Sequence, residues 1–271
     1  MIEITAENGV VYLKSNNLKS AHGFSTRLGG VSKSEHTGSL NLAFGRGDDR
    51  AVVLKNLGLF ADAVGFDAQK IVSVSQIHSS DVRIVSAKDA GQGYFGDEAF
   101  SCDGYVTNVS GIALGVKTAD CVPILMEGCD AAGNVLAVGA VHAGWRGTIS
   151  KIAVECIKKL SAFGVEPYNI RVAIGPAICG ECFCVREDFY DAVVAILGER
   201  ETKKFVLPSD ERGVWTCDLI AMNKAFLLDV GIKAENIEIS RECTCCDPLK
   251  YFSHRYTNGK RGTMLSVIQM P

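Results

Sequence analysis

The chain has 271 residues, of which 47% are hydrophobic and 22% are charged, so it contains enough apolar material for one large folded domain. Its 28 Lys and Arg residues nearly balance its 31 Asp and Glu residues, and the formal net charge of −3 is spread without long runs of one sign. This balance excludes nucleic acid and a membrane surface as expected partners.

The N-terminal segment MIEITAENGV lacks the basic region and apolar core of a signal peptide. The longest uncharged stretch, Ala131–Trp145, is too short to cross a bilayer. Eleven cysteines in a long chain without an export signal are expected to be reduced thiols rather than a disulfide framework. We therefore expect a soluble, cytoplasmic protein and predict a single domain over residues 1–271, while the sequence does not indicate the oligomeric state.

In chain order, amphipathic spacing first predicts a helix over Ala51–Val64. Strands then dominate the middle of the chain, because short runs rich in Val and Ile follow one another. The predicted strands are Ile71–Val74, Val82–Val85, Gly104–Val109, Ile112–Val116, Val122–Met126, Val135–Val141, Ile170–Ile174 and, near the C-terminus, Met264–Ile268.

The clearest helical spacing lies in Ile149–Leu160, with Thr148 as the predicted N-cap and Gly164 as the predicted C-terminal stop. Two more amphipathic helices are predicted over Glu187–Leu197 and Asp218–Asp229. Helices thus alternate with groups of strands rather than with single strands. This order favours an α+β fold with a mixed sheet over a doubly wound one.

Three side chains at strand ends are the candidate reaction centre: His78 in SQIHSSDV, Cys121 in KTADCVPIL and His142 in VGAVHAGWRGT. Strand ends suit catalytic groups, because a rigid sheet holds them beside loops that admit a ligand. The small residues around His142 leave open space, and Trp145 and Arg146 offer recognition surface. Taken singly, a His or a Cys is more often an ordinary core residue.

Two imidazoles and a thiolate form a suitable set of three ligands for a catalytic zinc ion, which keeps a fourth position for water or substrate. Water bound there ionises near neutral pH. Because the three residues are far apart in the sequence, their spacing does not by itself establish the site.

Two segments are candidates for binding a ligand. Arg146 precedes the predicted helix start, where exposed amides and a guanidinium suit phosphate, although Arg146 could equally pair with a surface carboxylate. The Gly-rich segment from Phe24 to Asp49 carries Arg27 and Asn41, and loops of this composition often close over ligands.

Seven segments, in this order, resemble the bacterial YfiH family of laccase-domain proteins, or polyphenol oxidases, which are related to human FAMIN. They are STRLGGVS with SLNLAFG, QIHSSDV, CDGYVT, TADCVPIL, AVHAGWRGT, IGPAICGECFCV and CTCCDPLKYFSHR. The resemblance covers nearly the whole chain.

The resemblance implies a four-layer α/β/β/α fold with mixed sheets and a zinc site at His78, Cys121 and His142. It also implies purine nucleoside phosphorylase activity, with adenosine, inosine, guanosine, S-methyl-5′-thioadenosine and phosphate as substrates, together with adenosine deaminase activity. A hydroxide on such a zinc ion suits attack at C6 of adenine. We take Arg146 and Arg27 as candidates for phosphate, and Asp120 as a group that orients a ligand or shuttles a proton.

The chain departs from the family pattern at HRYTNGKRGT, so the resemblance assigns no role to Arg255 or Arg261. The clusters Cys179, Cys182, Cys184 and Cys243, Cys245, Cys246 could hold a second metal or a redox pair. The family does not require such a site, so ordinary reduced thiols are the expectation.

Two other enzymatic functions use the same three residues. A copper-dependent, laccase-like polyphenol oxidase fits two His and one Cys as copper ligands, but the chain has only five histidines and no His-x-His pair for the further copper cluster of laccases. Copper remains a possible substitute for zinc. A Cys-His hydrolase would use Cys121 as a nucleophile activated by a histidine. A non-catalytic partner protein is a third possibility.

Overall fold

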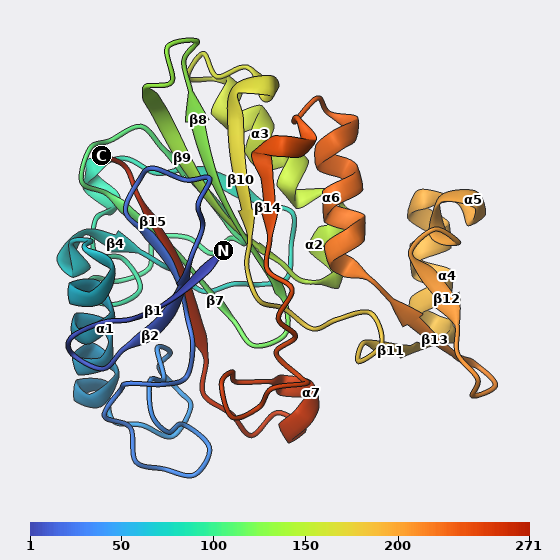
Figure 1. Cartoon of the computed structure of the whole chain (residues 1–271), viewed down its shortest axis with the longest axis horizontal. Helices are drawn as coiled ribbons and strands as arrows, with labels where there is room; N and C mark the ends of the chain where they lie inside the picture. The colour runs from blue at the N-terminus through green and yellow to red at the C-terminus, as the bar shows by residue number, and fades with distance from the viewer.

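Strands form two six-stranded sheets and one small sheet in the computed structural model, which describes residues 1–271 (Figure 1). The first sheet has the order β1 (Ile2–Thr5), β2 (Val11–Lys14), β3 (His22–Ser25), β15 (Met264–Gln269), β7 (Ala113–Thr118), β4 (Ile71–Val72). The second has the order β14 (Ile237–Ile239), β10 (Ile170–Ile174), β8 (Val122–Cys129), β9 (Val135–Ala143), β6 (Gly104–Thr107), β5 (Val82–Ile84).

Both large sheets are mixed. The pairs β4 with β7, β5 with β6, and β10 with β14 are parallel, whereas the other neighbours are antiparallel. The helices are α1 (Arg50–Val64), α2 (Trp145–Ile149), α3 (Ile152–Ser161), α4 (Glu187–Leu197), α5 (Glu199–Thr202), α6 (Leu219–Asp229) and α7 (His254–Thr257).

The two sheets pack face to face, and helices cover both outer faces (Figure 1). Strand β8 shows how the sequence produces this packing, because all eight of its residues are buried. Leu125 points into the core between the sheets, whereas Ile124 and Met126 join the core beneath α3 and α6. On the other side, Leu57 of α1 packs against the outer face of the first sheet. The predicted four-layer α/β/β/α arrangement is therefore confirmed.

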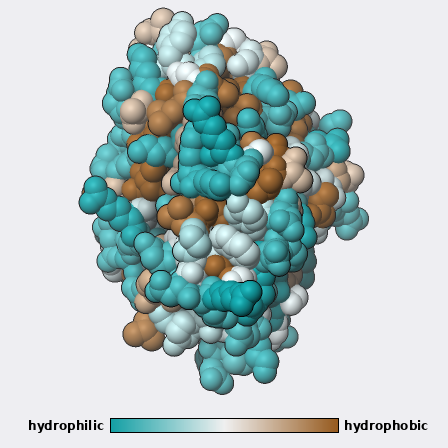
Figure 2. Space-filling view, turned by 90° about the vertical axis from the view of Figure 1, so that its right-hand side faces the viewer, coloured by the Kyte–Doolittle hydropathy of each residue, from teal (hydrophilic) through white to brown (hydrophobic).

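A small extension projects from the second half of the molecule. It contains α4, α5 and a three-stranded antiparallel sheet of β11 (Cys184–Arg186), β13 (Val214–Cys217) and β12 (Val206–Pro208) (Figure 1). The face of the molecule that carries it is largely hydrophilic with scattered apolar patches (Figure 2). The sequence did not predict these three strands, nor the N-terminal strands β1 to β3.

All eight predicted strands are present, with bounds that differ by a few residues. The helix over Glu187–Leu197 is present as predicted, and α6 begins after Asp218, whose carboxylate accepts the amide of Ala221. None of the helices combines the length and hydrophobicity that a membrane span requires. All eleven cysteines are free.

The predicted start of the helix at Thr148 is wrong. The chain is already helical from Trp145, and Thr148 is a buried residue inside α2. The helix is then interrupted, because Lys151 adopts the left-handed conformation (φ 58°) and serves as the N-cap of α3. A pattern of apolar spacing detects which face is buried, but it does not register a single backbone break of this kind.

Candidate metal centre and substrate cavity

His78, Cys121 and His142 converge at one end of the second sheet. His142 lies near the end of β9, and Cys121 immediately precedes β8, which pairs with β9. His78 comes from the loop between β4 and β5 in a left-handed conformation (φ 59°). Each side chain offers one potential ligand atom, and these three atoms all lie within 4.8 Å of one another; His78 Nε2 is 3.9 Å from Cys121 Sγ.

Asp103, immediately before β6, contacts His142 directly and holds the loop that carries His78. Its carboxylate accepts a hydrogen bond from His142 Nδ1 at 2.8 Å, which leaves Nε2 of that ring free for a metal. The same carboxylate accepts hydrogen bonds from the backbone amides of Ile77, His78 and Ser79, so it also holds the loop that carries His78. Asp103 is fully buried.

Gly144 makes room for the three side chains. A Cβ atom at this position would lie 2.8 Å from His78 Cδ2, 3.5 Å from Cys121 Sγ and 3.6 Å from His142 Cε1. The first of these distances is too short for a real contact. The residue after the strand must therefore be glycine if the two rings and the sulfur are to face one another.

The charges of Cys121, His142 and Asp103 depend on one another. Burial opposes ionisation of Cys121, but the two neighbouring histidines outweigh it and lower the pKa of the thiol to about 6. Burial likewise opposes the charge on His142, but Cys121 and Asp103 raise its pKa to about 9. For Asp103, hydrogen bonds from His142 and Ser79 overcome burial and lower the pKa to about 2. The thiol is thus prepared to act as a thiolate, the form that binds metal or attacks an electrophile.

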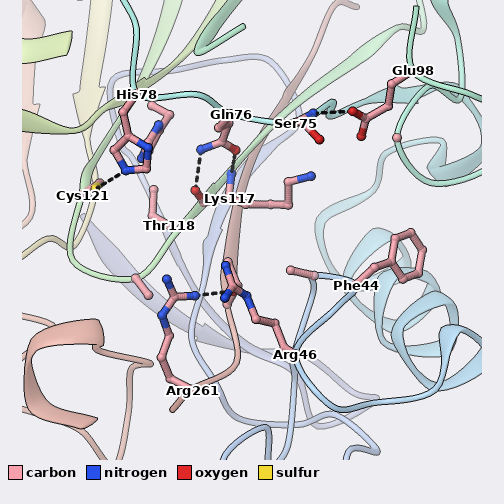
Figure 3. Close-up of a pocket in the computed structure, with 15 residues that line it drawn as sticks. Phe44, Arg46, Ser75, Gln76, His78, Glu98, Lys117, Thr118, Cys121 and Arg261 are labelled. Carbon is pink, nitrogen blue, oxygen red and sulfur yellow. Dashed lines mark hydrogen bonds between the residues drawn. The ribbon is translucent and has the colours of Figure 1, made fainter. Parts of the chain in front are cut away.

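The three residues line one side of a cavity of about 320 Å³, a size suited to a small ligand (Figure 3). Arg46 and Arg261 lie together on another side, and Lys117 and Phe44 lie across from His78 (Figure 3). The cavity is otherwise lined mainly by polar and small residues, namely Ala43, Ser75, Gln76, Gly93, Glu98, Thr118, Ala119 and Thr263.

The cationic side chains of the cavity repel one another. Burial and then the nearby Arg46 lower the pKa of Arg261 to about 10, and its buried Nε atom has no hydrogen-bond partner. Arg261 Nη1 donates to Thr263 Oγ1. Two close guanidinium groups, one with an unused buried donor, form a surface suited to an anion.

Arg27 and Asn41, two residues that the sequence suggested for substrate binding, do not line this cavity. Arg27 donates to the carbonyl oxygens of Gly38 and Pro248 and packs over the ring of Phe252. Asn41 is fully buried and bonds Asp48 and the backbone of the same region. Both side chains therefore order the Gly-rich loops that approach the cavity.

Asp120 and Arg146 lie closer to the centre but also outside this cavity. Asp120, next to Cys121, accepts hydrogen bonds from Thr244 Oγ1 and from the amide of Arg255, each at 2.6 Å. Arg146 packs over Trp145 at 4.1 Å and lines a second hollow of about 440 Å³, which shares only His78 with the first.

Sequence reasoning missed Asp103, Arg46, Arg261 and Lys117. Asp103 had a visible signal, since an aspartate in CDGYVT directly precedes a buried strand. Arg46 and Arg261 lie in Gly-containing loops more than 200 residues apart, in GRGDD and GKRGT. No local pattern distinguishes such arginines from solvated ones.

A family model described as multi-copper polyphenol oxidoreductase laccase matches residues 21–271. The chain belongs to this family. It is 34% identical to a purine nucleoside phosphorylase, YlmD, of Bacillus subtilis over 94% of this chain and 90% of that protein. It is 32% identical to adenosine deaminase RL5 from an unknown prokaryotic organism, over 89% of this chain and 90% of that protein.

Among solved structures, the hypothetical protein YfiH of Bacillus licheniformis superposes with a TM-score of 0.87 at 30% identity, covering 99% of this chain and 97% of that one. The resemblance to YfiH laccase-domain proteins is therefore confirmed across fold and sequence. Relatives in this family carry the names of phosphorylases and deaminases of purine nucleosides, which supports an enzymatic role for the shared domain.

Proposed function

We propose that the protein is a zinc-dependent purine nucleoside phosphorylase that acts on adenosine, inosine, guanosine and S-methyl-5′-thioadenosine and also deaminates adenosine. One observation carries the proposal. The ligand atoms of His78, Cys121 and His142 lie within 4.8 Å of one another beside a cavity that also presents two adjacent arginines. The names of the relatives at 34% and 32% identity support purine nucleosides as the substrate class, with adenosine for deamination. The other substrates of the proposal are those that the family resemblance implies.

The donor set fits zinc. Two imidazole nitrogens and a thiolate are preferred zinc ligands, Asp103 orients one ring, and Gly144 leaves the space between them open. When bound, zinc would supply Lewis acidity to the reacting group of the nucleoside or to water. Copper is a possible substitute, because the same ligands bind it.

Arg46 and Arg261 bind phosphate in this proposal. Both guanidinium groups reach the cavity that the metal ligands line, and paired forks recognise phosphate oxygens through charge-assisted hydrogen bonds. Phosphate held there is oriented towards C1′ of the ribose. Attack at C1′ forms ribose 1-phosphate and releases the purine from its glycosidic bond.

The rest of the cavity accommodates the nucleoside. Phe44 provides an aromatic surface for the purine ring, and hydroxyl groups of Ser75, Thr118 and Thr263 provide hydrogen-bond partners for the sugar. Gln76 contributes rigidity instead, because its amide is bonded in both directions to the backbone of Lys117. Asp120 positions Cys121 through its own bonds to Thr244 and Arg255.

The test is to incubate purified, zinc-loaded protein with adenosine and phosphate and to separate the products by chromatography. Adenine with ribose 1-phosphate reports phosphorolysis, and inosine reports deamination. His78→Ala and His142→Ala should abolish both while circular dichroism remains unchanged. His36→Ala is the matched control, since the His36 side chain is exposed and does not line the cavity. Full turnover by either site variant contradicts the proposal.

A Cys-His hydrolase is the second candidate, favoured by the lowered pKa of Cys121 beside His142. The two functions predict different metal contents and a different reactivity of the Cys121 thiol towards alkylation. A zinc enzyme loses its bound zinc in Cys121→Ala, and zinc shields Cys121 from iodoacetamide. A hydrolase is purified without metal and is inactivated by alkylation of Cys121.

A copper-dependent polyphenol oxidase, the third candidate, follows from the description of the family. The groups able to hold a metal are the His78, Cys121 and His142 set and one set of four cysteines, so the histidine-rich cluster of a laccase is absent from residues 1–271. Oxidation of phenols in proportion to copper content, without phosphorolysis, would favour this candidate.

A further inference from the structure

Four cysteines that the proposed reaction does not use gather at a second location. The sulfur atoms of Cys179, Cys182, Cys243 and Cys246 all lie within 4.8 Å of one another, and Cys182 Sγ is 3.4 Å from Cys246 Sγ. We propose that these four side chains form a tetrahedral zinc site that cross-links the segment after β10 and the segment after β14. The site shares no ligand with the His78, Cys121 and His142 centre.

The sequence spacing supports metal binding. The four residues form two Cys-x-x-Cys pairs, Cys179 with Cys182 and Cys243 with Cys246. Each pair lies on a tight turn, in which Phe183 donates to Cys179 O and Asp247 donates to Cys243 O. Structural zinc sites are commonly built from two such pairs, because a turn of this length directs both sulfurs to one side.

Hydrogen bonds between the two segments hold the two turns side by side without a metal ion. Ala177 and Cys243 form a parallel bridge, and the amide of Thr244 donates to Ala177 O at 3.1 Å. The amide of Cys179 donates to Cys243 Sγ at 3.2 Å. Amide donors of this kind stabilise a thiolate that binds a metal. In Figure 1 the chain segments after β10 and β14 run beside each other towards β11 and α7.

The distances between the four sulfur atoms fit one metal ion rather than a cluster of several metal atoms. Zinc bonds of about 2.3 Å to four tetrahedral sulfurs place those sulfurs roughly 3.8 Å apart, within the limit observed here. An iron–sulfur cluster needs more widely separated cysteines, because its iron and sulfide atoms lie between them. A disulfide would join only two of the four, although all four converge.

Hydrogen bonds connect the four-cysteine site to the residue that precedes Cys121. Arg255 Nη1 donates to Cys182 O, and the amide of Arg255 donates to Asp120. Thr244, between two of the proposed ligands, donates to the other oxygen of Asp120. Asp120 directly precedes Cys121. Zinc at the four cysteines therefore holds in place the partners of the residue that positions Cys121.

The experiment measures bound metal in protein purified under reducing conditions with added zinc. Protein carrying His78→Ala, Cys121→Ala and His142→Ala together keeps the four cysteines intact, and we expect it to bind one zinc ion per chain. Its X-ray absorption spectrum should show four sulfur neighbours at about 2.3 Å and no nitrogen. This outcome does not depend on whether the protein is a phosphorylase.

Two cysteine variants complete the test. Cys179→Ser with Cys243→Ser should lower the zinc content of otherwise wild-type protein by one ion per chain. Cys184→Ser is the matched control and should leave the content unchanged, because exposed Cys184 lies outside the group of four. The proposal is overturned if the triple site variant binds no zinc, binds iron instead, or contains a Cys182–Cys246 disulfide by mass spectrometry.

Discussion

Asp103 bonds the Nδ1 atom of His142 at 2.8 Å, and this buried pair links two of the three candidate metal ligands. The same carboxylate accepts hydrogen bonds from the amides of residues 77 to 79. One side chain therefore fixes both the His142 imidazole on β9 and the loop that carries His78. A metal at this centre therefore depends on a residue that does not touch it.

Asp103→Asn should weaken zinc binding by about 10- to 100-fold, because an amide cannot accept the imidazole proton and the three backbone amides equally well. Competition with a chromogenic chelator measures the change. Asp81→Asn is the control, since Asp81 is half-buried and its side chain pairs only with Arg83. Unchanged zinc affinity in Asp103→Asn would show that His142 does not need the Asp103 carboxylate to bind the metal.

Gly144→Ala should remove metal binding and activity while preserving the fold. The added methyl group would meet His78 Cδ2 at 2.8 Å, and His78 is the exposed member of the three, so its ring would turn away. Gly58→Ala provides the control, because a Cβ there meets nothing within 4 Å and the site lies within α1. That control should gain about 0.5–1 kcal/mol in the free energy of unfolding. Normal zinc content in Gly144→Ala would contradict the expectation.

Arg46→Gln and Arg261→Gln should each raise the KM for phosphate at least tenfold, with a smaller effect on nucleoside binding. Their guanidinium groups line the cavity of the metal ligands, whereas Arg146 packs over Trp145 in the neighbouring hollow. Arg146→Gln is therefore expected to change the KM for phosphate less than twofold. Steady-state kinetics at varied phosphate separates the cases, and the opposite ranking would assign phosphate to Arg146.

Lys117 makes stability depend on pH. Burial lowers its pKa from 10.5 to about 8, so the folded protein releases this proton before the unfolded chain does. The cost of burying the charge is fully present below about pH 8 and disappears as the pH rises towards 10.5. The shift corresponds to at most on the order of 3 kcal/mol.

Lys117→Met should therefore increase the free energy of unfolding at pH 7, offset in part by the loss of the bond from Lys117 Nζ to Ser73 O. The advantage over wild type should shrink between pH 8 and 10. Urea unfolding of chelator-treated protein at several pH values measures it, and Lys70→Met, at an exposed lysine, serves as the control. A constant difference over this range would show that Lys117 titrates normally.

The sequence predicted the secondary structure of the central region well, because the driving force there is local. Alternating and apolar runs such as Val122–Met126 and Val135–Val141 contain their own signal of burial, and both became central strands. Strands β1 to β3 and β11 to β13 were missed, since they are short and depend on neighbours for their stability. The break at Lys151 was missed because it changes one residue's backbone and not the apolar pattern.

For the reaction centre, the sequence by itself identified the residue types and the resemblance, and with them His78, Cys121 and His142. Only the tertiary structure decided that their ligand atoms converge, and that Asp103, Arg46 and Arg261 accompany them while Arg27 and Asn41 do not line the cavity. The physical reason is that a site of this kind is assembled by sheet pairing and loop packing between segments up to about 200 residues apart. Local sequence patterns record the burial of a residue, but the direction of its side chain relative to a distant partner is set only when the sheets and loops come together.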